Sequence, residues 1–298
     1  MMLSLVRCCA NSVLSSSVSK NFYSKESGVQ NIRNYVNFTS HKVISCSALT
    51  PAGDHEYAKV GLRRDLMPRH VAVILDGNRR WLKSHGKELD YRPFYKANML
   101  VVDLCLKWGI PTVTSFIYGL RTLGRSKEAN DLLFRQLQEW LQDMLEVFIR
   151  KRVRVRVIGE RFWLPKSVQD TIKQVEEATT TNSTRELVLA VCYEGRNDIV
   201  KATKIICKKA MAGEIELEAI DESMIQRHLS SSASDTNPNP NPDLLIRTGG
   251  DLYLSNFMMW ELAQTELYFT TIYGPEFNEA EFLEALRNFQ RREKAFDK

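Results

Sequence analysis

The sequence predicts an α/β domain with a central, mainly parallel six-stranded sheet flanked by helices. Short runs of β-branched and apolar residues alternate along the chain with longer segments whose apolar residues recur at helical spacing. That alternation is typical of strand, helix, strand units joined by right-handed crossovers. Two of the expected strands end in a charged side chain and a glycine turn, and ligands bind at the carboxyl ends of such strands.

The first half of this domain contains two strands and two helices. Residues 70–75 are a continuous apolar run, which suits a strand covered on both faces. Residues 94–108 have apolar side chains at helical spacing and end at Gly109, a C-cap signal. Residues 111–118 are β-branched and aromatic and predict a second strand. Residues 127–150 predict a long amphipathic helix, whose apolar stripe faces the core or lines a tunnel for an apolar chain.

The third and fourth strands follow the same alternation. Valine alternates with arginine in the strand 153–158, and a proline opens the helix 165–179. The strand 186–193 leads through a turn, residues 194–198, into a helix at 199–211. These elements extend the expected parallel sheet.

A low-complexity segment interrupts the pattern at residues 230–242. Its serines and three Asn-Pro repeats cannot form regular structure, so we expect a loop. The elements expected after it are a strand, a helix capped by Ser255, a last short strand and a closing helix, at residues 243–247, 255–262, 266–269 and 279–292.

Residues 1–53 differ from the rest of the chain and predict a transit peptide with a disordered leader. They are rich in Ser, Asn and Val, contain several basic residues and have no acidic residue before Glu26. We expect a plastid import signal, with a mitochondrial signal as the alternative, and a catalytic domain at residues 54–298. No window approaches the roughly 18 apolar residues of a membrane span, so no transmembrane segment is expected.

Composition narrows the function classes. The net charge is +5 and part of it belongs to the leader, so the domain is only mildly basic and does not resemble a nucleic-acid binder. Cys105, Cys192 and Cys207 lie outside the leader, at spacings that match neither a metal site nor a disulfide framework. A reducing compartment is therefore expected.

The end of the first strand predicts a diphosphate site. Asp76 stands at the strand tip, Gly77 and Asn78 form a tight turn, and Arg79 and Arg80 begin a helix. Backbone N–H groups and guanidinium groups at such a point favour an anion. Asp76 could hold a divalent cation against the phosphate oxygens. The alternative is that Asp76 only caps the helix and both arginines are solvated.

The strand 243–247 repeats this design and predicts a second anion site. It ends in Arg247, which Thr248 and two glycines follow, and the last short strand begins with the carboxylate Glu266. Two such turns and two carboxylates in an apolar setting describe a pocket for two phosphorylated, apolar substrates and a magnesium ion.

These stretches resemble the signatures of the cis-prenyltransferases, the undecaprenyl diphosphate synthase family, and especially its plant short-chain members. The resemblance implies a single domain with an apolar substrate tunnel, a Mg2+ cofactor and a homodimer formed through the later part of the chain. It extends over residues 67–292 and rests on residues 70–81, 193–198, 242–250, 255–260 and 266–269.

The resemblance also implies roles for individual residues. Asp76 matches the essential carboxylate that binds magnesium and promotes ionisation, and Glu266 matches the second magnesium carboxylate. The residues matched to substrate diphosphate binding are Gly77, Asn78, Arg79 and Arg80 for the allylic substrate, Arg125 as a further arginine, and Arg247 and Ser255 for the second diphosphate.

Several positions depart from the family pattern. Leu89 and Pro93 stand where the family has Arg and His, and residues 118–123 replace a conserved loop. Tyr253 stands where the family has an arginine two residues before the binding serine. Arg92, Lys96 and Arg121 could replace some of the lost positive charge.

The expected function is that of a short-chain prenyl diphosphate synthase that condenses two dimethylallyl diphosphates into the irregular product lavandulyl diphosphate, with release of diphosphate. One alternative is regular cis condensation of dimethylallyl and isopentenyl diphosphates to a neryl or longer product. Another is a non-catalytic partner subunit of a prenyltransferase, against which the retained Asp76, Arg247 and Glu266 argue.

Overall fold

Six parallel strands form one sheet in the order β3-β4-β2-β1-β5-β6. The computed structural model describes residues 51–232, 234 and 240–296. The strands are β1 (His70–Ile74), β2 (Thr112–Tyr118), β3 (Val153–Ile158), β4 (Arg185–Val191), β5 (Leu244–Arg247) and β6 (Glu266–Phe269). The predicted fold class and all six predicted strands are confirmed; the predicted leader lies almost entirely outside the described residues.

The strand order places a switch point at β1. The chain passes from β1 to β2 on one side, and returns to β5 on the other side of β1. Ile74 pairs with Arg247 in register, so the carboxyl ends of β1 and β5 are adjacent. Crevices at such switch points are where open α/β sheets bind ligands.

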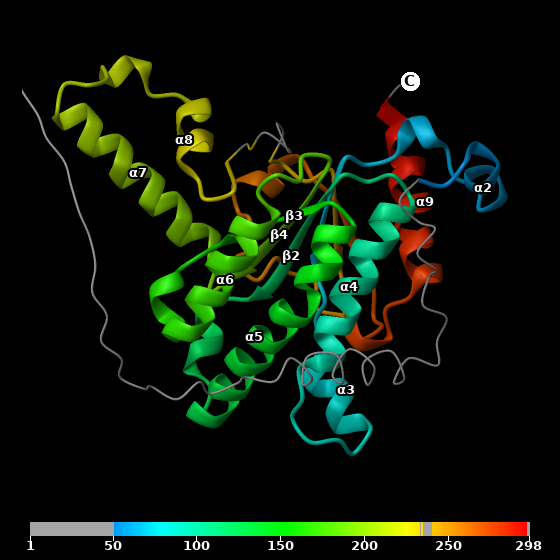
Figure 1. Ribbon diagram of the computed structural model, residues 1–298. Coiled ribbons are helices and arrows are strands. Elements are labelled where there is room, and N and C mark those ends of the chain that lie inside the picture. Colours follow the sequence, from blue (N-terminus) through cyan, green and yellow to red (C-terminus); the bar gives the residue numbers. More distant parts are fainter. Residues whose placement is uncertain (1–50, 233, 235–239, 297–298) are drawn as a thin grey trace, which may run out of the picture. The chain divides into compact units, whose positions relative to one another are not determined.

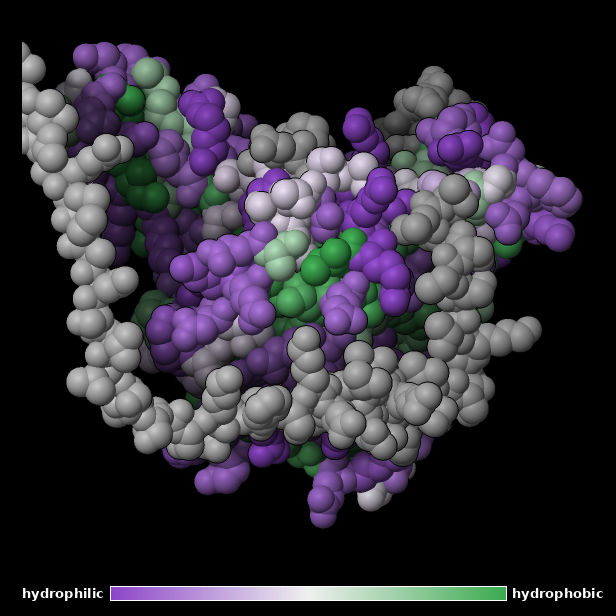
Figure 2. Space-filling model, in the orientation of Figure 1, coloured by the Kyte–Doolittle hydropathy of each residue, from purple (hydrophilic) through white to green (hydrophobic). Residues whose placement is uncertain are grey.

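Four helices cover one face of the sheet. They are α4 (Arg92–Lys107), α5 (Lys127–Arg150), α6 (Lys166–Thr179) and α9 (Glu279–Phe296). The helices α5 and α6 pack on β3, α4 packs on β2, and α9 packs on β6 (Figure 1). In α5, Leu137 and Phe148 are fully buried, which confirms that most of the predicted apolar stripe faces the core. Figure 2 shows a patch of hydrophobic residues near the centre of this view, bordered by hydrophilic residues.

The opposite face has a smaller core. Ala72, Ala190 and Leu245 of the strands pack with Phe257 and Leu262 of the segment that follows β5. Two further helices, α7 (Gly195–Met211) and α8 (Glu222–His228), pack against each other, and α7 extends away from the sheet (Figure 1). No described helix is long and apolar enough to cross a membrane.

The prediction of a helix at residues 255–262 is wrong. Ser255, Asn256 and Met258 have φ values of 53°, 58° and 44°, in the left-handed region that an α-helix of L-residues cannot use. Only a 3₁₀ turn, η5 (Glu261–Gln264), forms there. Ser255 is therefore part of a strained turn and does not cap a helix.

The segment around residue 54 is packed against the rest of the domain. Ala52 is buried and its N–H donates to the carbonyl of Lys107 at 2.8 Å. A short helix that the sequence pattern did not predict, α2 (Asp54–Lys59), follows. Tyr57 in this helix is buried, and its hydroxyl donates to the carbonyl of Trp108 at 2.7 Å. The described residues just before residue 54 are thus packed against the domain, and the division at residue 53 stays a prediction.

Part of the predicted loop at residues 230–242 is described and is held by buried carboxylates. The Ser230 hydroxyl donates to Asp198 at 2.6 Å, and the Ser231 hydroxyl donates to the buried Glu261. Residues 233 and 235–239 of this loop lie outside the described residues.

Candidate active site

The turn after β1 fixes Asp76 at the carboxyl edge of the sheet. Gly77 has a φ of 91°, and a Cβ there would lie 2.4 Å from Cδ1 of Tyr273, so only glycine fits. Its N–H donates to Oδ1 of Asp76 at 2.6 Å. Asn78 begins the helix α3 (Asn78–Ser84) and donates from Nδ2 to the carbonyl of Leu75 at 2.8 Å. The turn is therefore rigid, and the Asp76 carboxylate has a defined direction.

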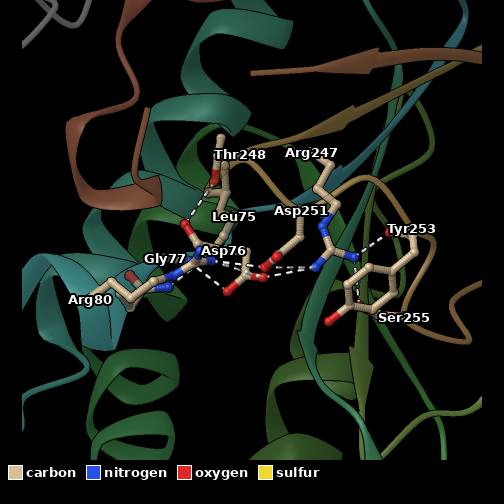
Figure 3. Close-up of polar contacts among 10 residues, drawn as sticks. Leu75, Asp76, Gly77, Arg80, Arg247, Thr248, Asp251, Tyr253 and Ser255 are labelled. Atoms are coloured by element: carbon tan, nitrogen blue, oxygen red, sulfur yellow. Dashed lines mark hydrogen bonds and ion pairs between the residues drawn. The ribbon is translucent and has the colours of Figure 1, made fainter. Parts of the chain in front are cut away.

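The turn after β5 supports the first one from behind. The Thr248 hydroxyl donates to the carbonyl of Asp76 at 2.9 Å (Figure 3). Gly249 has a φ of 89°, and a Cβ there would lie 3.0 Å from the carbonyl carbon of Asp76 and 2.9 Å from Nη2 of Arg80. The two predicted glycine turns thus form one structure.

Two carboxylates and two guanidinium groups meet where these turns touch (Figure 3). Arg247 Nη2 lies 2.8 Å from Asp76 Oδ2, and Arg80 Nη2 lies 2.9 Å from Asp251 Oδ2. The other two separations are 3.7 Å for Arg80 to Asp76 and 3.6 Å for Arg247 to Asp251. We call these four residues the charge cluster. Its formal charges cancel, so it can exchange partners with a metal ion and an anion together.

A pocket of about 1070 Å³ opens in front of this cluster. Its charged lining is mainly basic: Arg79, Arg80, Arg121, Arg125 and Arg196, with the carboxylates Asp76 and Glu194. Such a lining suits a polyanion such as diphosphate.

Much of the remaining pocket wall is apolar and aromatic. Its members are Ile74, Leu75, Tyr91, Phe94, Phe116, Ile117, Tyr118, Leu133, Leu254 and Met259. Further aromatic rings pack against it. The ring centroids of Tyr95 and Phe94 are 5.3 Å apart, and those of Phe134 and Tyr118 are 5.9 Å apart. The pocket therefore fits an amphiphile with an anionic head and a short hydrocarbon tail.

Tyr118 is a neutral phenol in this wall. Burial raises its pKa far above the ordinary value, and the nearby Cys192 thiol adds to the effect. At neutral pH Tyr118 is therefore protonated, and it cannot act as a general base.

The structure brings most of the predicted site residues together. Those that line the pocket are Asp76, Gly77, Asn78, Arg79, Arg80, Arg125 and Ser255. Arg247 lies directly behind them and donates to the Ser255 hydroxyl at 2.6 Å. Of the arginines and lysine that could replace lost charge, Arg121 lines the pocket, whereas Arg92 pairs with Asp90 and Lys96 does not line it.

Glu266 is not part of this site within the chain. It begins β6 and pairs in register with Leu244, at the amino edge of the sheet, whereas Asp76 follows the carboxyl end of β1. Its carboxylate forms an ion pair with Arg292, whose Nη1 lies 2.7 Å from Oε2 of Glu266. The expected pairing of Asp76 with Glu266 is therefore not formed, because the two residues lie at opposite ends of their strands.

Asp251 is the site residue that the sequence interpretation missed. Its carboxylate shares both arginine partners with Asp76, and both aspartates are about one-third exposed. The signal was present, because Arg247 and Asp251 have the same four-residue spacing as Asp76 and Arg80. Mg2+ is commonly held by one or two carboxylates together with substrate phosphates, so this aspartate pair fits magnesium. The described residues contain no larger cluster of metal-binding side chains.

A turn with strained backbone at Asn256 forms part of the pocket wall. Asn256, with its positive φ, accepts at its carbonyl from Gly195 N–H at 2.7 Å and at Oδ1 from Arg196 N–H at 3.0 Å. A Cβ on Gly195 would lie 2.6 Å from the Met259 nitrogen. The strained turn is thus locked to the start of α7, as expected where strain serves a site.

Comparison with known proteins agrees with this geometry. The family model described as putative undecaprenyl diphosphate synthase matches residues 74–297. Cis-prenyltransferase 4, chloroplastic, of Solanum lycopersicum is 42% identical over 237 residues, 79% of this chain and 76% of that protein. (2Z,6Z)-farnesyl diphosphate synthase CPT6, chloroplastic, of the same plant is 37% identical over 84% of this chain and 87% of its own length.

Solved structures give the same result. Lavandulyl diphosphate synthase from Lavandula x intermedia, in complex with dimethylallyl diphosphate, matches with a TM-score of 0.72 and 33% identity, over 76% of this chain and 96% of that one. A probable undecaprenyl diphosphate synthase from Campylobacter jejuni matches with a TM-score of 0.63 and 28% identity, over 78% of this chain and 99% of that one. The chain therefore belongs to the undecaprenyl diphosphate synthase family and is a cis-prenyltransferase.

Proposed function

We propose that this enzyme condenses two molecules of dimethylallyl diphosphate into lavandulyl diphosphate and releases one diphosphate. The observation that carries the proposal is that Tyr253 and Ser255 line the pocket, whereas Arg247 does not. The place where a second diphosphate would be clamped by arginine is covered by a phenol ring. A second substrate with a different pose, and an allylic double bond as nucleophile, suits such a site. The likeness to a lavandulyl diphosphate synthase that binds dimethylallyl diphosphate supports this choice.

The first substrate places its diphosphate on the turn from Gly77 to Arg80. Arg79 and Arg80 neutralise charge on the diphosphate as the allylic C–O bond breaks. Asp76 and Asp251 are the residues that would hold magnesium, which supplies further neutralisation of the leaving group. In this role Arg80 turns from the carboxylates to the phosphate oxygens, while Arg247 stays paired with Asp76.

The carbocation forms against the apolar wall. The rings of Phe94 and Phe116 line the pocket there and keep water away from it. The double bond of the second dimethylallyl group attacks through its internal carbon, which forms the new C–C bond. The resulting tertiary cation loses a methyl proton to the released diphosphate, and the electron pair of that C–H bond makes the product's new double bond.

Regular cis condensation with isopentenyl diphosphate is the second candidate. It is favoured by two relatives, named nerylneryl diphosphate synthase and (2Z,6Z)-farnesyl diphosphate synthase, which are 40% and 37% identical to this chain. The two reactions differ in the nucleophile, and therefore in the linkage of the product.

Product analysis separates the candidates. Purified protein is incubated with magnesium and dimethylallyl diphosphate alone, and in parallel with isopentenyl diphosphate added; the products are dephosphorylated and identified. Lavandulol from the first incubation supports the proposal. Nerol or a longer cis alcohol from the second incubation only would select regular condensation. Absence of diphosphate release in both would leave a non-catalytic partner role.

We also propose that the enzyme is a homodimer. The helix α7 and the segment after it expose apolar side chains that water solvates poorly: Val200, Ile205, Met211 and Leu217. Light scattering on a size-exclusion column tests this, and Met211→Glu with Leu217→Glu should shift the mass toward one chain. An unchanged mass in the double variant would place the interface elsewhere.

Plastid localisation is the third part of the proposal. Relatives named chloroplastic and the composition of the leader both support it. Residues 1–53 fused to a fluorescent protein should direct it to plastids. Fluorescence that stays in the cytosol or enters mitochondria would contradict this assignment.

A further inference from the structure

The Arg247 side chain is buried and does not line the pocket. Nη2 is taken by Asp76 at 2.8 Å and approaches Asp251 at 3.6 Å. Nη1 donates to the Ser255 hydroxyl at 2.6 Å and to the carbonyl of Tyr253, and Nε is buried without a hydrogen-bond partner among the described residues. The side chain is only 1% exposed. A diphosphate could reach this guanidinium group only if several of these contacts were broken.

The Tyr253 ring closes the remaining face. The guanidinium carbon of Arg247 lies 4.2 Å from the ring centroid, a stacking distance at which a cation and a π-face attract each other. Tyr253 is 59% exposed and lines the pocket. Figure 3 shows its ring next to the guanidinium group of Arg247. The ring therefore stands between Arg247 and any ligand in the pocket.

Other arginines are open to the ligand instead. Arg121 and Arg196 line the pocket, and neither side chain forms an ion pair with another described residue. All three side chains carry the same charge. They differ in whether a ligand in the pocket can reach them.

We propose that Tyr253 is a specificity-determining residue that caps Arg247 against substrate. In that arrangement Arg247 is a positioning residue, which holds the Asp76 carboxylate in place through its Nη2 group. This differs from the diphosphate-binding role that the family resemblance implied for Arg247. The proposal deepens the proposed function, since it rests on a prenyl diphosphate being the ligand of the pocket.

A double-mutant cycle at Tyr253 and Arg247 tests the cap. Binding of inorganic diphosphate is measured by titration calorimetry to the wild type, Tyr253→Ala, Arg247→Gln and the double variant. With the cap in place, Arg247→Gln should change the dissociation constant less than about threefold. In the Tyr253→Ala background the same change should weaken binding about tenfold or more, because the uncovered guanidinium then contacts the anion.

Tyr253→Phe is the matched control, because it keeps the ring and removes only the hydroxyl. It should behave like the wild type in the binding assay. A tenfold loss of diphosphate affinity in Arg247→Gln with Tyr253 intact would overturn the proposal. Equal effects of Arg247→Gln in both backgrounds would overturn it as well.

Steady-state kinetics test the positioning role of Arg247. Arg247→Gln should lower kcat at least tenfold with KM for dimethylallyl diphosphate within about threefold, and Arg247→Lys should recover part of kcat by restoring one ion pair to Asp76. A rise in KM with kcat unchanged would contradict positioning. Thermal melting of each variant identifies any that fail to fold, and Arg247→Lys then carries the test. The calorimetry does not depend on which product forms, so failure of the cap and failure of the proposed reaction are distinguishable.

Discussion

Asp76 is the residue on which the proposed chemistry depends most. Its carboxylate accepts from the Gly77 N–H and its carbonyl accepts from the Thr248 hydroxyl, while the carboxylate is about one-third exposed beside two arginines. Asp76→Asn keeps the shape but removes the charge, so turnover should fall at least about a hundredfold with the melting temperature nearly unchanged. Asp131→Asn is the matched control, since Asp131 is an exposed partner of Lys127 away from the pocket. Activity of Asp76→Asn within a few-fold of the control would exclude the proposed role.

His70 gives the fold a pH dependence of known sign. Burial lowers its pKa to about 3, and the positive charge of Arg156 acts in the same direction. In the unfolded chain the pKa is near 6.5, so below that pH the unfolded state binds a proton that the folded state does not. The stability that His70 contributes is therefore complete above about pH 6.5 and decreases toward pH 3.

The expected loss between pH 7 and pH 5 is about 2 kcal/mol in the free energy of unfolding. Chemical denaturation of the wild type and of His70→Gln at both pH values measures it as a difference. Asp198 and Glu261 act in the opposite direction, because burial raises the pKa of each, but they are common to both proteins. Curves that shift equally with pH in the two proteins would show that His70 is protonated in the fold.

Gly77 should be irreplaceable for steric reasons. Gly77→Ala would bring a Cβ to 2.4 Å from the Tyr273 ring, in addition to the cost of a φ of 91°. Gly86→Ala is the control, because Gly86 also has a positive φ of 60° but no atom within 4 Å of its Cβ position. We expect Gly86→Ala to cost about 1 kcal/mol of stability and Gly77→Ala about 1–3 kcal/mol more, with loss of activity. Equal costs, measured by denaturant titration, would show that Tyr273 moves freely.

At the scale of elements, the helix α2 should belong to the stable fold. Tyr57→Ala leaves a cavity against Trp108 and removes a buried hydrogen bond, so the free energy of unfolding should fall by about 3–5 kcal/mol. Tyr57→Phe removes only the hydrogen bond and should cost about 1 kcal/mol. Urea denaturation of both variants is the measurement. A small effect of Tyr57→Ala would mean that α2 is not packed in solution, and that the domain begins after it.

The sequence pattern predicted the regular elements well and the irregular ones poorly. Strands such as β3, with alternating valines, and long amphipathic helices such as α5 have a periodicity that burial imposes. The segment at Ser255 looks helical by composition, but its left-handed turns are fixed by Gly195 and Arg196, which are distant in sequence. The helix α2 is too short to have a periodic signal.

The sequence predicted the site residues that lie where a strand ends in a glycine turn. It did not predict the positions that depend on the order of the strands in the sheet. Asp76, Arg80 and Arg247 follow strand ends and lie together as expected. Glu266 was grouped with them, although a residue that begins a parallel strand lies at the opposite edge of the sheet. The adjacency of β1 and β5, which makes Asp251 a neighbour of Asp76, depends on the whole topology and on no local motif.

At the scale of the whole molecule, we propose that the two glycine turns form one site for a metal and an allylic diphosphate. The switch point at β1 brings the turns together, and the pocket adds five arginines and an apolar wall. The most direct test is a crystal structure of the enzyme with magnesium and the thiolodiphosphate analogue of dimethylallyl diphosphate, which ionises very slowly. We predict the diphosphate on the turn from Gly77 to Arg80, magnesium between that group and the carboxylates of Asp76 and Asp251, and the hydrocarbon tail against Phe94 and Phe116. An analogue bound elsewhere, or a metal held by Glu266 without either aspartate, would contradict the account.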